Sequence, residues 1–252
     1  MHRYFDINAQ GHSIRCKLYY KEQKPVEKAI IFCTGFAGHK DNAAAERFAE
    51  KVLSKHGNVI VLVFDWPAHG DDVKKKLVLD DCGVYLDLVI NAVKTKYEIC
   101  ELYAYATSFG AYLVLKYISE HGNPFEKLAL RCPAVDMYEV LTRTIMKNDE
   151  YDKIMKGKPV QVGFDRKIIV TRELLEALKT NDIRRNDYLD YADNILILHG
   201  TADEVVPFDS GKAFAEDQLI DFIPIERADH RFINPVHMSL ANKYALQFFD
   251  LQ

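Results

Sequence analysis

Two kinds of hydrophobic pattern alternate along most of the chain. The first kind is a continuous apolar run of five to seven residues, which is typical of a strand covered on both faces. Such runs occur at residues 29–33, 58–64, 101–105, 127–131, 195–199 and 219–225. The second kind has apolar residues at helical spacing, at about 43–56, 80–97, 108–121 and 235–249. The alternation predicts βαβ units and a mainly parallel sheet with helices on both faces.

The beginning of the chain has a different pattern. Residues 12–20 alternate polar and apolar side chains, which indicates a strand with only one buried face. Together with the first few residues, this segment predicts an antiparallel hairpin at the edge of the sheet.

Residues 133–193 interrupt the alternation. About sixty residues separate two strands that an ordinary helical crossover joins with roughly half that number. A charged, helical part is expected at 136–156, a hairpin at 159–170 that turns at 163–165, and a short helix at 172–179. We predict a core of residues 1–132 and 194–252, with 133–193 inserted as a lid or cap over the binding edge. The alternative is a surface subdomain without contact to the site.

Several polar or small residues follow the ends of predicted strands. Gly35, Asp65, Ser108 and Asp203 all come shortly after such an end. Parallel sheets of this kind bind ligands outside the carboxyl ends of their strands. We therefore expect these residues to share one edge of the sheet.

Ser108 lies where a strand turns abruptly into a helix. The flanking pattern is Ala106-x-Ser108-x-Gly110, with small residues on both sides of the serine. A serine on such a strained turn presents its Oγ above the sheet, where it can act as a nucleophile. The alternative is a serine that only caps a core helix.

A serine nucleophile needs a base, and the base needs an orienting acid. Asp203, in the loop after the strand at 195–199, is the candidate acid, with Glu204 and Asp209 as nearby rivals. His230, in the loop after the last predicted strand, is the candidate base. On its own, a histidine in such a loop is more often a surface residue than a base.

The tetrahedral intermediate of acyl transfer also needs hydrogen-bond donors for its oxyanion. The backbone N–H of Phe109 follows the nucleophile, and a second donor is expected at Phe36, with Ala37 as an alternative. Gly35 allows that loop to approach closely. Gly35, Trp66, Tyr138 and Phe164 are the candidate substrate contacts. The aromatic residues among them favour an aromatic or medium-length acyl group, although packing in the core and the lid explains them equally well.

The chain resembles the α/β-hydrolase superfamily over nearly its whole length. The order Ser108, Asp203, His230, each after a strand, is the order of the triad in that fold. The resemblance implies the α/β-hydrolase fold and these triad roles. Within it, the loop at residues 35–40 and the insertion at 133–193 are similar to small bacterial cinnamoyl/feruloyl esterases. Thr34, Pro67-Ala68 and Asp71 depart from the family pattern. The motifs are Thr34-Gly35-Phe36, Asp65-x-x-x-His69-Gly70, Ala106-x-Ser108-x-Gly110 and His199-Gly200-x-x-Asp203-x-x-Val206-Pro207.

Composition narrows the range of functions. The 252 residues are 48% hydrophobic and carry a net charge of −4, without a basic run long enough for a nucleic-acid groove. Five scattered cysteines without C-x-x-C spacing indicate reduced thiols in a cytoplasmic protein. No signal-type apolar segment, membrane span, nucleotide-binding glycine loop or metal-ligand spacing is recognisable, so we expect no cofactor, metal, nucleic acid or membrane partner.

The sequence thus predicts a serine esterase that acts on a small-molecule ester through a Ser108–His230–Asp203 triad and an acyl-enzyme. Thioesterase, amidase and monoacylglycerol-lipase-like activity are alternatives within the same chemistry. A ligand-binding protein that keeps the fold without catalysis is the alternative from another class. An exposed apolar patch on the insertion would serve a homodimer or lid closure equally well.

Overall fold

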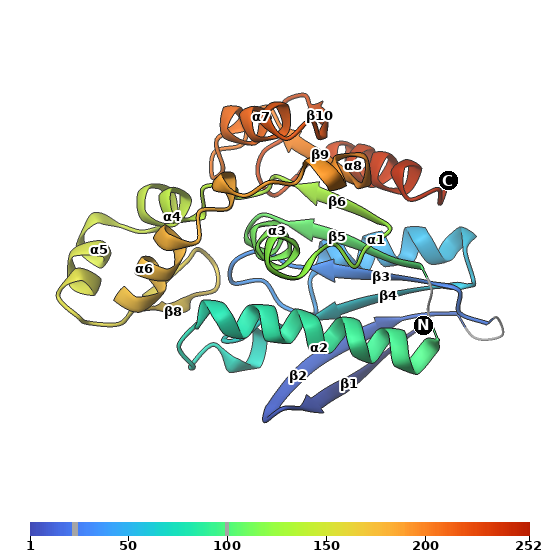
Figure 1. Cartoon of the computed structure of the whole chain (residues 1–252), viewed down its shortest axis with the longest axis horizontal. Helices are drawn as coiled ribbons and strands as arrows, with labels where there is room; N and C mark the ends of the chain where they lie inside the picture. Colours follow the sequence, from blue (N-terminus) through green and yellow to red (C-terminus); the bar gives the residue numbers. More distant parts are fainter. Residues whose placement is uncertain (22–24, 99–100) are drawn as a thin grey trace.

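The computed structural model describes residues 1–21, 25–98 and 101–252. An eight-stranded sheet forms the centre of the molecule, in the order β1-β2-β4-β3-β5-β6-β9-β10 (Figure 1). Its strands are β1 (His2–Ala9), β2 (His12–Tyr19), β3 (Lys28–Cys33), β4 (Val59–Phe64), β5 (Glu101–Thr107), β6 (Lys127–Arg131), β9 (Ile195–Gly200) and β10 (Asp221–Ile225).

The strand directions confirm the expected α/β-hydrolase sheet. From β4 to β10 all neighbouring strands run parallel, whereas β1 pairs antiparallel with β2, and β2 antiparallel with β4. The antiparallel hairpin lies at the edge of the sheet, as its alternating pattern predicts.

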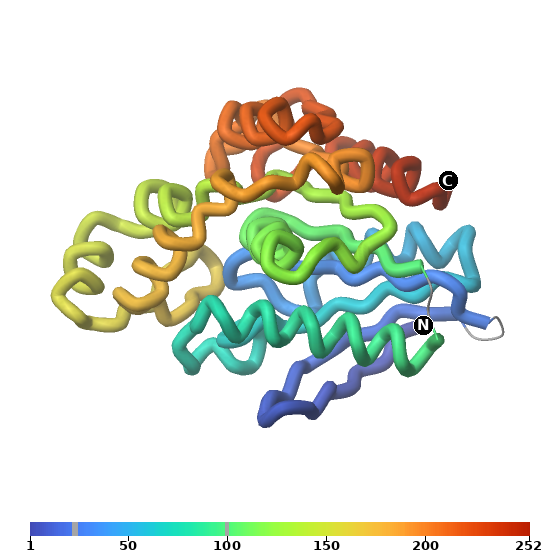
Figure 2. Tube along the Cα trace, in the orientation of Figure 1, coloured from blue at the N-terminus to red at the C-terminus, as the bar shows by residue number. Residues whose placement is uncertain are grey.

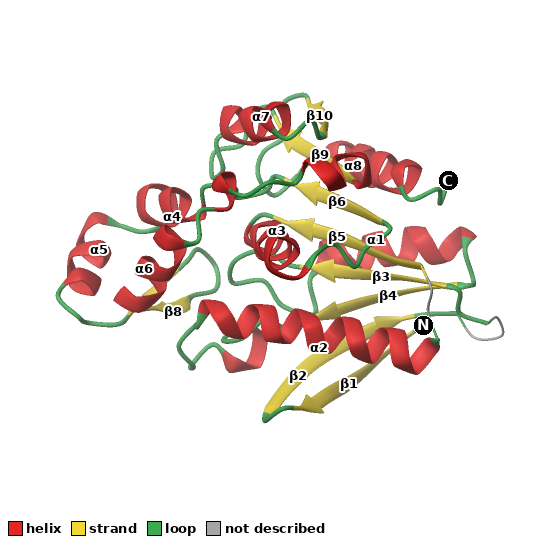
Figure 3. Ribbon diagram, in the orientation of Figure 1, coloured by secondary structure: helices red, strands yellow, loops and turns green. Residues whose placement is uncertain are grey.

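Helices cover both faces of the sheet (Figure 3). One buried cluster joins the sheet to α1 (Ala43–Lys55) and α8 (Pro235–Phe248). A larger cluster on the opposite face involves α2 (Leu79–Tyr97), α3 (Phe109–His121) and α7 (Phe208–Asp217). The apolar runs of β3, β4, β5 and β9 are buried on both sides for this reason.

The segment between β6 and β9 packs beyond the carboxyl ends of the parallel strands, at the left of the molecule in Figures 1 and 2. It contains α4 (Met137–Glu139), η2 (Val140–Ile145), α5 (Asn148–Met155), β7 (Val160–Val162), β8 (Ile168–Val170) and α6 (Arg172–Thr180), followed by the short turns η3 (Ile183–Arg185) and η4 (Leu189–Asn194). Its apolar residues join the larger core cluster. The structure confirms the antiparallel β7–β8 hairpin; a lid function stays a prediction.

Three local expectations need correction. The segment 136–156 is not one helix: η2 is a π-helix, and extended residues at Met146 and Lys147 separate it from α5. The last strand begins at Asp221, because exposed Leu219 adopts a left-handed conformation with φ of 55°. Helix α7 has no counterpart in the predicted elements.

Four of the five cysteines are buried as free thiols, namely Cys16, Cys33, Cys82 and Cys132, whereas Cys100 lies outside the described residues. In the part of the chain that the structure describes, no helix has the length and apolar content needed to cross a bilayer.

Candidate active site

Ser108 occupies a strained turn between β5 and α3. Its backbone has φ 52° and ψ −119°, a conformation that costs free energy for a residue with a side chain. The turn is held because the Ser108 N–H donates to the carbonyl of Arg131 over 3.0 Å. A Cβ atom on Gly110 would lie 2.4 Å from the Thr34 carbonyl oxygen, so only glycine lets α3 pack this closely on the end of β3. Ala106 is fully buried in β5 and fits there without the glycine that the family often has.

The three residues predicted to act together lie in hydrogen-bond contact. His230 Nε2 is 3.0 Å from Ser108 Oγ, and His230 Nδ1 is 2.8 Å from Asp203 Oδ2. Ser108 and His230 are 122 residues apart in sequence, and His230 and Asp203 are 27 residues apart, so the sheet brings these residues together. The two distances match a nucleophile, a base and an orienting acid in line.

The Asp203 carboxylate is buried and held from several sides. Its Oδ1 accepts the N–H groups of Val205 and Val206, at 2.9 and 2.8 Å. Burial by itself raises the pKa of Asp203, but hydrogen bonds from the His199 and His230 imidazoles outweigh it and hold this pKa well below its usual range. Asp203 is therefore ionised at any pH near neutrality and faces His230 as an anion.

Gly35 brings the loop after β3 against the nucleophile. A Cβ atom at this position would lie 3.1 Å from the Cβ of Ser108. Helix α3 begins at Phe109, so its N–H has no partner within the helix. Within the described residues, the N–H groups of Phe36 and Phe109 donate to no protein acceptor. The two predicted oxyanion donors thus belong to the residues that follow Gly35 and Ser108, and their hydrogens have no acceptor among the described residues.

A buried ion pair ties the loop after β3 to the loop after β4. Asp65 accepts the backbone N–H of Lys40 at 2.5 Å, and its other oxygen lies 3.3 Å from Lys40 Nζ. Burial nevertheless raises the pKa of Asp65, because the contacts with Lys40 compensate only in part. A Cβ on Gly70 would lie 2.1 Å from an Asp65 oxygen, so this glycine makes room for the carboxylate.

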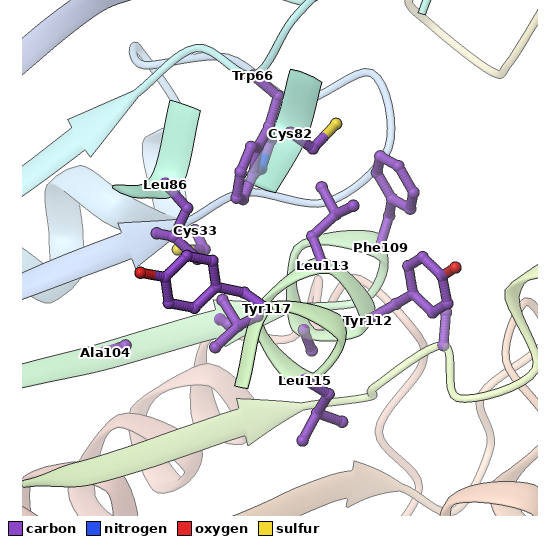
Figure 4. Close-up of a cluster of buried hydrophobic side chains, with 14 of the residues drawn as sticks. Cys33, Trp66, Cys82, Leu86, Ala104, Phe109, Tyr112, Leu113, Leu115 and Tyr117 are labelled. Atoms are coloured by element: carbon purple, nitrogen blue, oxygen red, sulfur yellow. The ribbon is translucent and has the colours of Figure 1, made fainter. Parts of the chain in front are cut away.

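Trp66 lies in the core and not at a surface open to substrate. It is 1% exposed, and its indole N–H donates to the Thr34 carbonyl at 2.9 Å. Figure 4 draws Trp66 among the buried side chains of the larger cluster, with Phe109 and Tyr112 projecting from α3. This placement corrects the expectation that Trp66 lines the substrate site, because its polar atom and its ring both serve to support the loop that carries Gly35.

Phe36, Phe109 and His69 form an aromatic group beside the nucleophile. The Phe36 and Phe109 rings meet edge to face at 5.7 Å, and the His69 ring stacks on Phe109 at 6.2 Å. Phe36 is half-buried, whereas Phe109 is fully buried. Burial lowers the pKa of His69 to about 4, so this imidazole is neutral at physiological pH.

The two remaining candidate contacts lie on the insertion. Tyr138 lines a cleft of about 150 Å³ between α3 and the insertion, together with Tyr112 and Leu178. Ser108 is not part of the lining of this cleft. Phe164 is 59% exposed at the tip of the β7–β8 hairpin.

The hairpin tip touches the loop that carries His230. Asp165 forms an ion pair of 3.0 Å with Arg231, the residue after His230. Both side chains are mostly exposed, so the ion pair is weak in water. The insertion therefore contacts the site loop, but through a surface interaction.

Two groups beside Asp203 were not singled out from the sequence. His199 places its Nε2 3.3 Å from Asp203 Oδ2, and the Cys132 thiol lies within 4.8 Å of this carboxylate. The spacing His199-x-x-x-Asp203 is the one signal that could have suggested the first contact. Nothing in the local sequence connects Cys132 with Asp203, because the two come from different strand ends.

One cluster among the described residues has side chains that could ligate a metal ion. Its members, Cys132, Asp203 and His230, bring one ligand atom each to within 4.8 Å of the others. Asp203 and His230 already hydrogen-bond to each other, so the grouping follows from that contact.

A family model of α/β hydrolases of unknown function matches residues 11–160, more than half of the chain. The chain belongs to this family. The match includes β2 to α5, and therefore the Ser108 turn and the loop of Gly35. No curated protein sequence matches the chain.

Solved structures with the same fold cover the whole molecule at low sequence identity. Est1E from Butyrivibrio proteoclasticus with bound ferulic acid has a TM-score of 0.76 and 17% identity, covering 98% of this chain and 99% of that one. A putative hydrolase from Agrobacterium vitis has a TM-score of 0.75 and 16% identity, with coverage of 100% and 99%. Mouse α/β hydrolase domain-containing protein 10 has a TM-score of 0.71 and 15% identity, with 98% of both chains covered. At these identities the likeness establishes the fold.

Proposed function

We propose that this α/β hydrolase is a serine esterase that cleaves carboxylic esters through an acyl-enzyme. The observation that carries the proposal is the line of contacts from Ser108 Oγ through His230 to Asp203. A ligand-binding protein of the same fold has no need for a serine held on a strained turn within reach of a base.

In the proposed mechanism, Ser108 Oγ attacks the ester carbonyl carbon while His230 Nε2 takes the hydroxyl proton. The N–H groups of Phe36 and Phe109 bind the oxyanion that forms. His230 then protonates the leaving alcohol, and the acyl group remains on Ser108. Water activated by His230 attacks the acyl-enzyme, which releases the acid and restores the serine. Asp203 orients the imidazole and stabilises its charged form throughout.

The proposed substrates have an aromatic or medium-length acyl group. Phe36 is half-buried beside Ser108 and offers a ring edge for such a group. The structural likeness to Est1E, whose structure contains ferulic acid, supports the same class. Thioesters and amides share the mechanism and differ only in their leaving group.

The deciding experiment is intact-mass spectrometry after incubation with a fluorophosphonate. We expect one adduct on the wild type and none on Ser108→Ala, because only an activated serine reacts. Ser54→Ala, a change at an exposed serine, is the matched control and should be labelled like the wild type. A panel of esters from p-nitrophenyl acetate to methyl ferulate then measures acyl preference.

An unlabelled but folded wild type that also leaves small esters intact contradicts the proposal and favours the binding protein. Hydrolysis that survives in Ser108→Ala contradicts the assignment of the nucleophile. A higher kcat/KM for acetate than for ferulate overturns the aromatic acyl class while leaving the esterase assignment intact.

A further inference from the structure

His199 is a buried histidine that the proposed mechanism does not use. It lies near the end of β9, four residues before Asp203, and is 0% exposed. A fully buried imidazole is expected to have a partner for its polar atoms, so its contacts indicate what it does.

The contacts of Nε2 define where the ring hydrogen lies. Nε2 is 3.2 Å from the carbonyl oxygen of Val206 and 3.3 Å from Asp203 Oδ2. Both neighbours are hydrogen-bond acceptors, so Nε2 must carry the hydrogen. The Val206 carbonyl oxygen and Asp203 Oδ2 compete for this one hydrogen. The N–H donates toward Val206 and presents its positive end to the Asp203 carboxylate.

The opposite edge of the ring has no polar partner. Nδ1 is buried without a hydrogen bond in the described part of the chain. A Cβ atom at Gly211 of α7 would lie only 2.4 Å from Nδ1, so the ring packs directly on that glycine. Phe208 and Phe222 flank the ring, with centroid distances of 5.7 and 6.3 Å. A hydrogen at Nδ1 would be buried without an acceptor, so the pocket favours the tautomer with hydrogen on Nε2.

We propose that His199 is a positioning residue that holds the Asp203 carboxylate in the orientation His230 requires. The proposal rests on the proposed serine esterase function and deepens it. Val205 and Val206 fix Oδ1, and His199 and His230 both contact Oδ2. The carboxylate therefore cannot turn without losing a donor.

This placement has a consequence for proton transfer. His230 can take the Ser108 proton only if Asp203 keeps its ring in line with the Oγ at 3.0 Å. A small misplacement of a catalytic group can lower the rate by about a hundredfold. Without the His199 N–H nearby, the negative charge of Asp203 is offset less and attracts the hydrogen on His230 Nδ1 more strongly. The other titratable or charged groups around this pair are Ser108, Cys132, Arg131 and Glu204.

The test compares His199→Leu, which removes the donor, with His199→Gln, whose amide nitrogen can replace Nε2. We expect kcat of His199→Leu to fall by about 10- to 100-fold with KM changed by less than about threefold. The acid limb of its kcat profile should move to higher pH. His199→Gln should recover most of the rate, and His12→Leu at the far edge of the sheet is the matched control.

Gly211→Ala provides a second variant in case His199→Leu does not fold. The added methyl group must displace the imidazole without touching Asp203. We expect the same loss of kcat and the same shift of the pH profile, although alanine favours the helix at this position. Rates in all variants are divided by the fraction of sites that a fluorophosphonate labels.

A further readout does not depend on turnover. The proton shared by His230 and Asp203 gives a low-field proton resonance, which should move or broaden in His199→Leu and Gly211→Ala. Wild-type kcat, pH profile and resonance in both variants would overturn the positioning role. A wild type that is unlabelled and inactive contradicts the esterase assignment instead, and the resonance then decides by itself whether His199 orients Asp203.

Discussion

The edge of the sheet around Ser108 and the insertion above it are held together in different ways. At the sheet edge, Asp203 is fully buried and accepts hydrogen bonds from Val205, Val206 and His230. The hairpin tip, by contrast, meets the His230 loop through Asp165 and Arg231, whose side chains are 79% and 64% exposed. Buried contacts hold Asp203 in the predicted triad, whereas the hairpin tip meets the His230 loop through an exposed contact.

The difference indicates separate roles for the two regions: catalysis at the sheet edge and ester selection at the hairpin tip. Chemistry needs side chains held within a fraction of an ångström, which burial and several donors provide. Selection among esters needs only a surface of suitable shape, which the tip of the β7–β8 hairpin can supply. Changes at the sheet edge should therefore alter kcat or folding, and changes at the hairpin tip should alter substrate preference.

The largest effect is expected at the acid of the triad. Asp203→Asn keeps the shape of the side chain but removes the charge and one acceptor, so His230 is no longer held in the required tautomer. We expect kcat to fall by about 10³- to 10⁴-fold. Asp209→Asn, at an exposed acid on α7, is the control and should retain activity. Equal activity of the two variants would assign the acid elsewhere.

A large loss of stability is expected for Gly110→Ala. The new methyl group would collide with the carbonyl oxygens of Thr34 and Cys33, at 2.4 and 2.6 Å, and push α3 off the sheet. Overpacking of this kind costs about 1–3 kcal/mol or more in the free energy of unfolding, measurable by urea denaturation. Gly83→Ala in α2 meets no atom within 4 Å and should instead stabilise by about 0.5–1 kcal/mol.

The buried His69 predicts a pH-dependent stability. Its pKa falls from 6.5 in the unfolded chain to about 4 in the fold, so the unfolded state binds the extra proton first as pH drops. Stability is therefore complete above pH 6.5 and is lost progressively between 6.5 and 4, by about 2 kcal/mol at pH 5.

Urea unfolding at pH 7 and pH 5 measures this effect. Nδ1 lies 2.8 Å from the Pro67 carbonyl, and the amide of His69→Asn can replace this contact without the titration. The difference between the two pH values should shrink in His69→Asn by about the same 2 kcal/mol. An unchanged difference would show that another group carries it.

The smallest effect on stability is expected at the hairpin tip. Separate and combined Arg231→Ala and Asp165→Asn changes should give a coupling energy below about 1 kcal/mol, because the ion pair is exposed. We expect the variants to change KM for bulky aromatic esters more than for acetyl esters. A coupling energy as large as the Gly110→Ala effect would remove the contrast between the two regions.

Much of the architecture follows from local pattern. Continuous apolar runs such as 29–33 and 195–199 are typical of strands buried on both faces, and their alternation with helical patterns predicts the parallel sheet. The position of Ser108 at a strand–helix junction is equally local, since it depends on Ala106 and Gly110. The order of Ser108, Asp203 and His230 then points to one edge of the sheet.

The remaining features depend on residues that are distant in sequence. The position of Trp66 just after a strand predicted a substrate contact. In the fold its indole N–H points inward and donates to the Thr34 carbonyl. The break between η2 and α5 is not visible in the charge pattern of 136–156. Helix α7 has only short apolar signals, and its Gly211 is explained by the His199 ring that packs on it.

By itself, the sequence determined the fold class and the position of Ser108 at a strand–helix junction, because strand burial and the strained turn are encoded within a few neighbouring residues. Only the tertiary structure decided which groups surround Asp203. His199 and Cys132 reach that carboxylate from two strand ends, and the parallel sheet sets β6 and β9 side by side in a register that no local pattern contains.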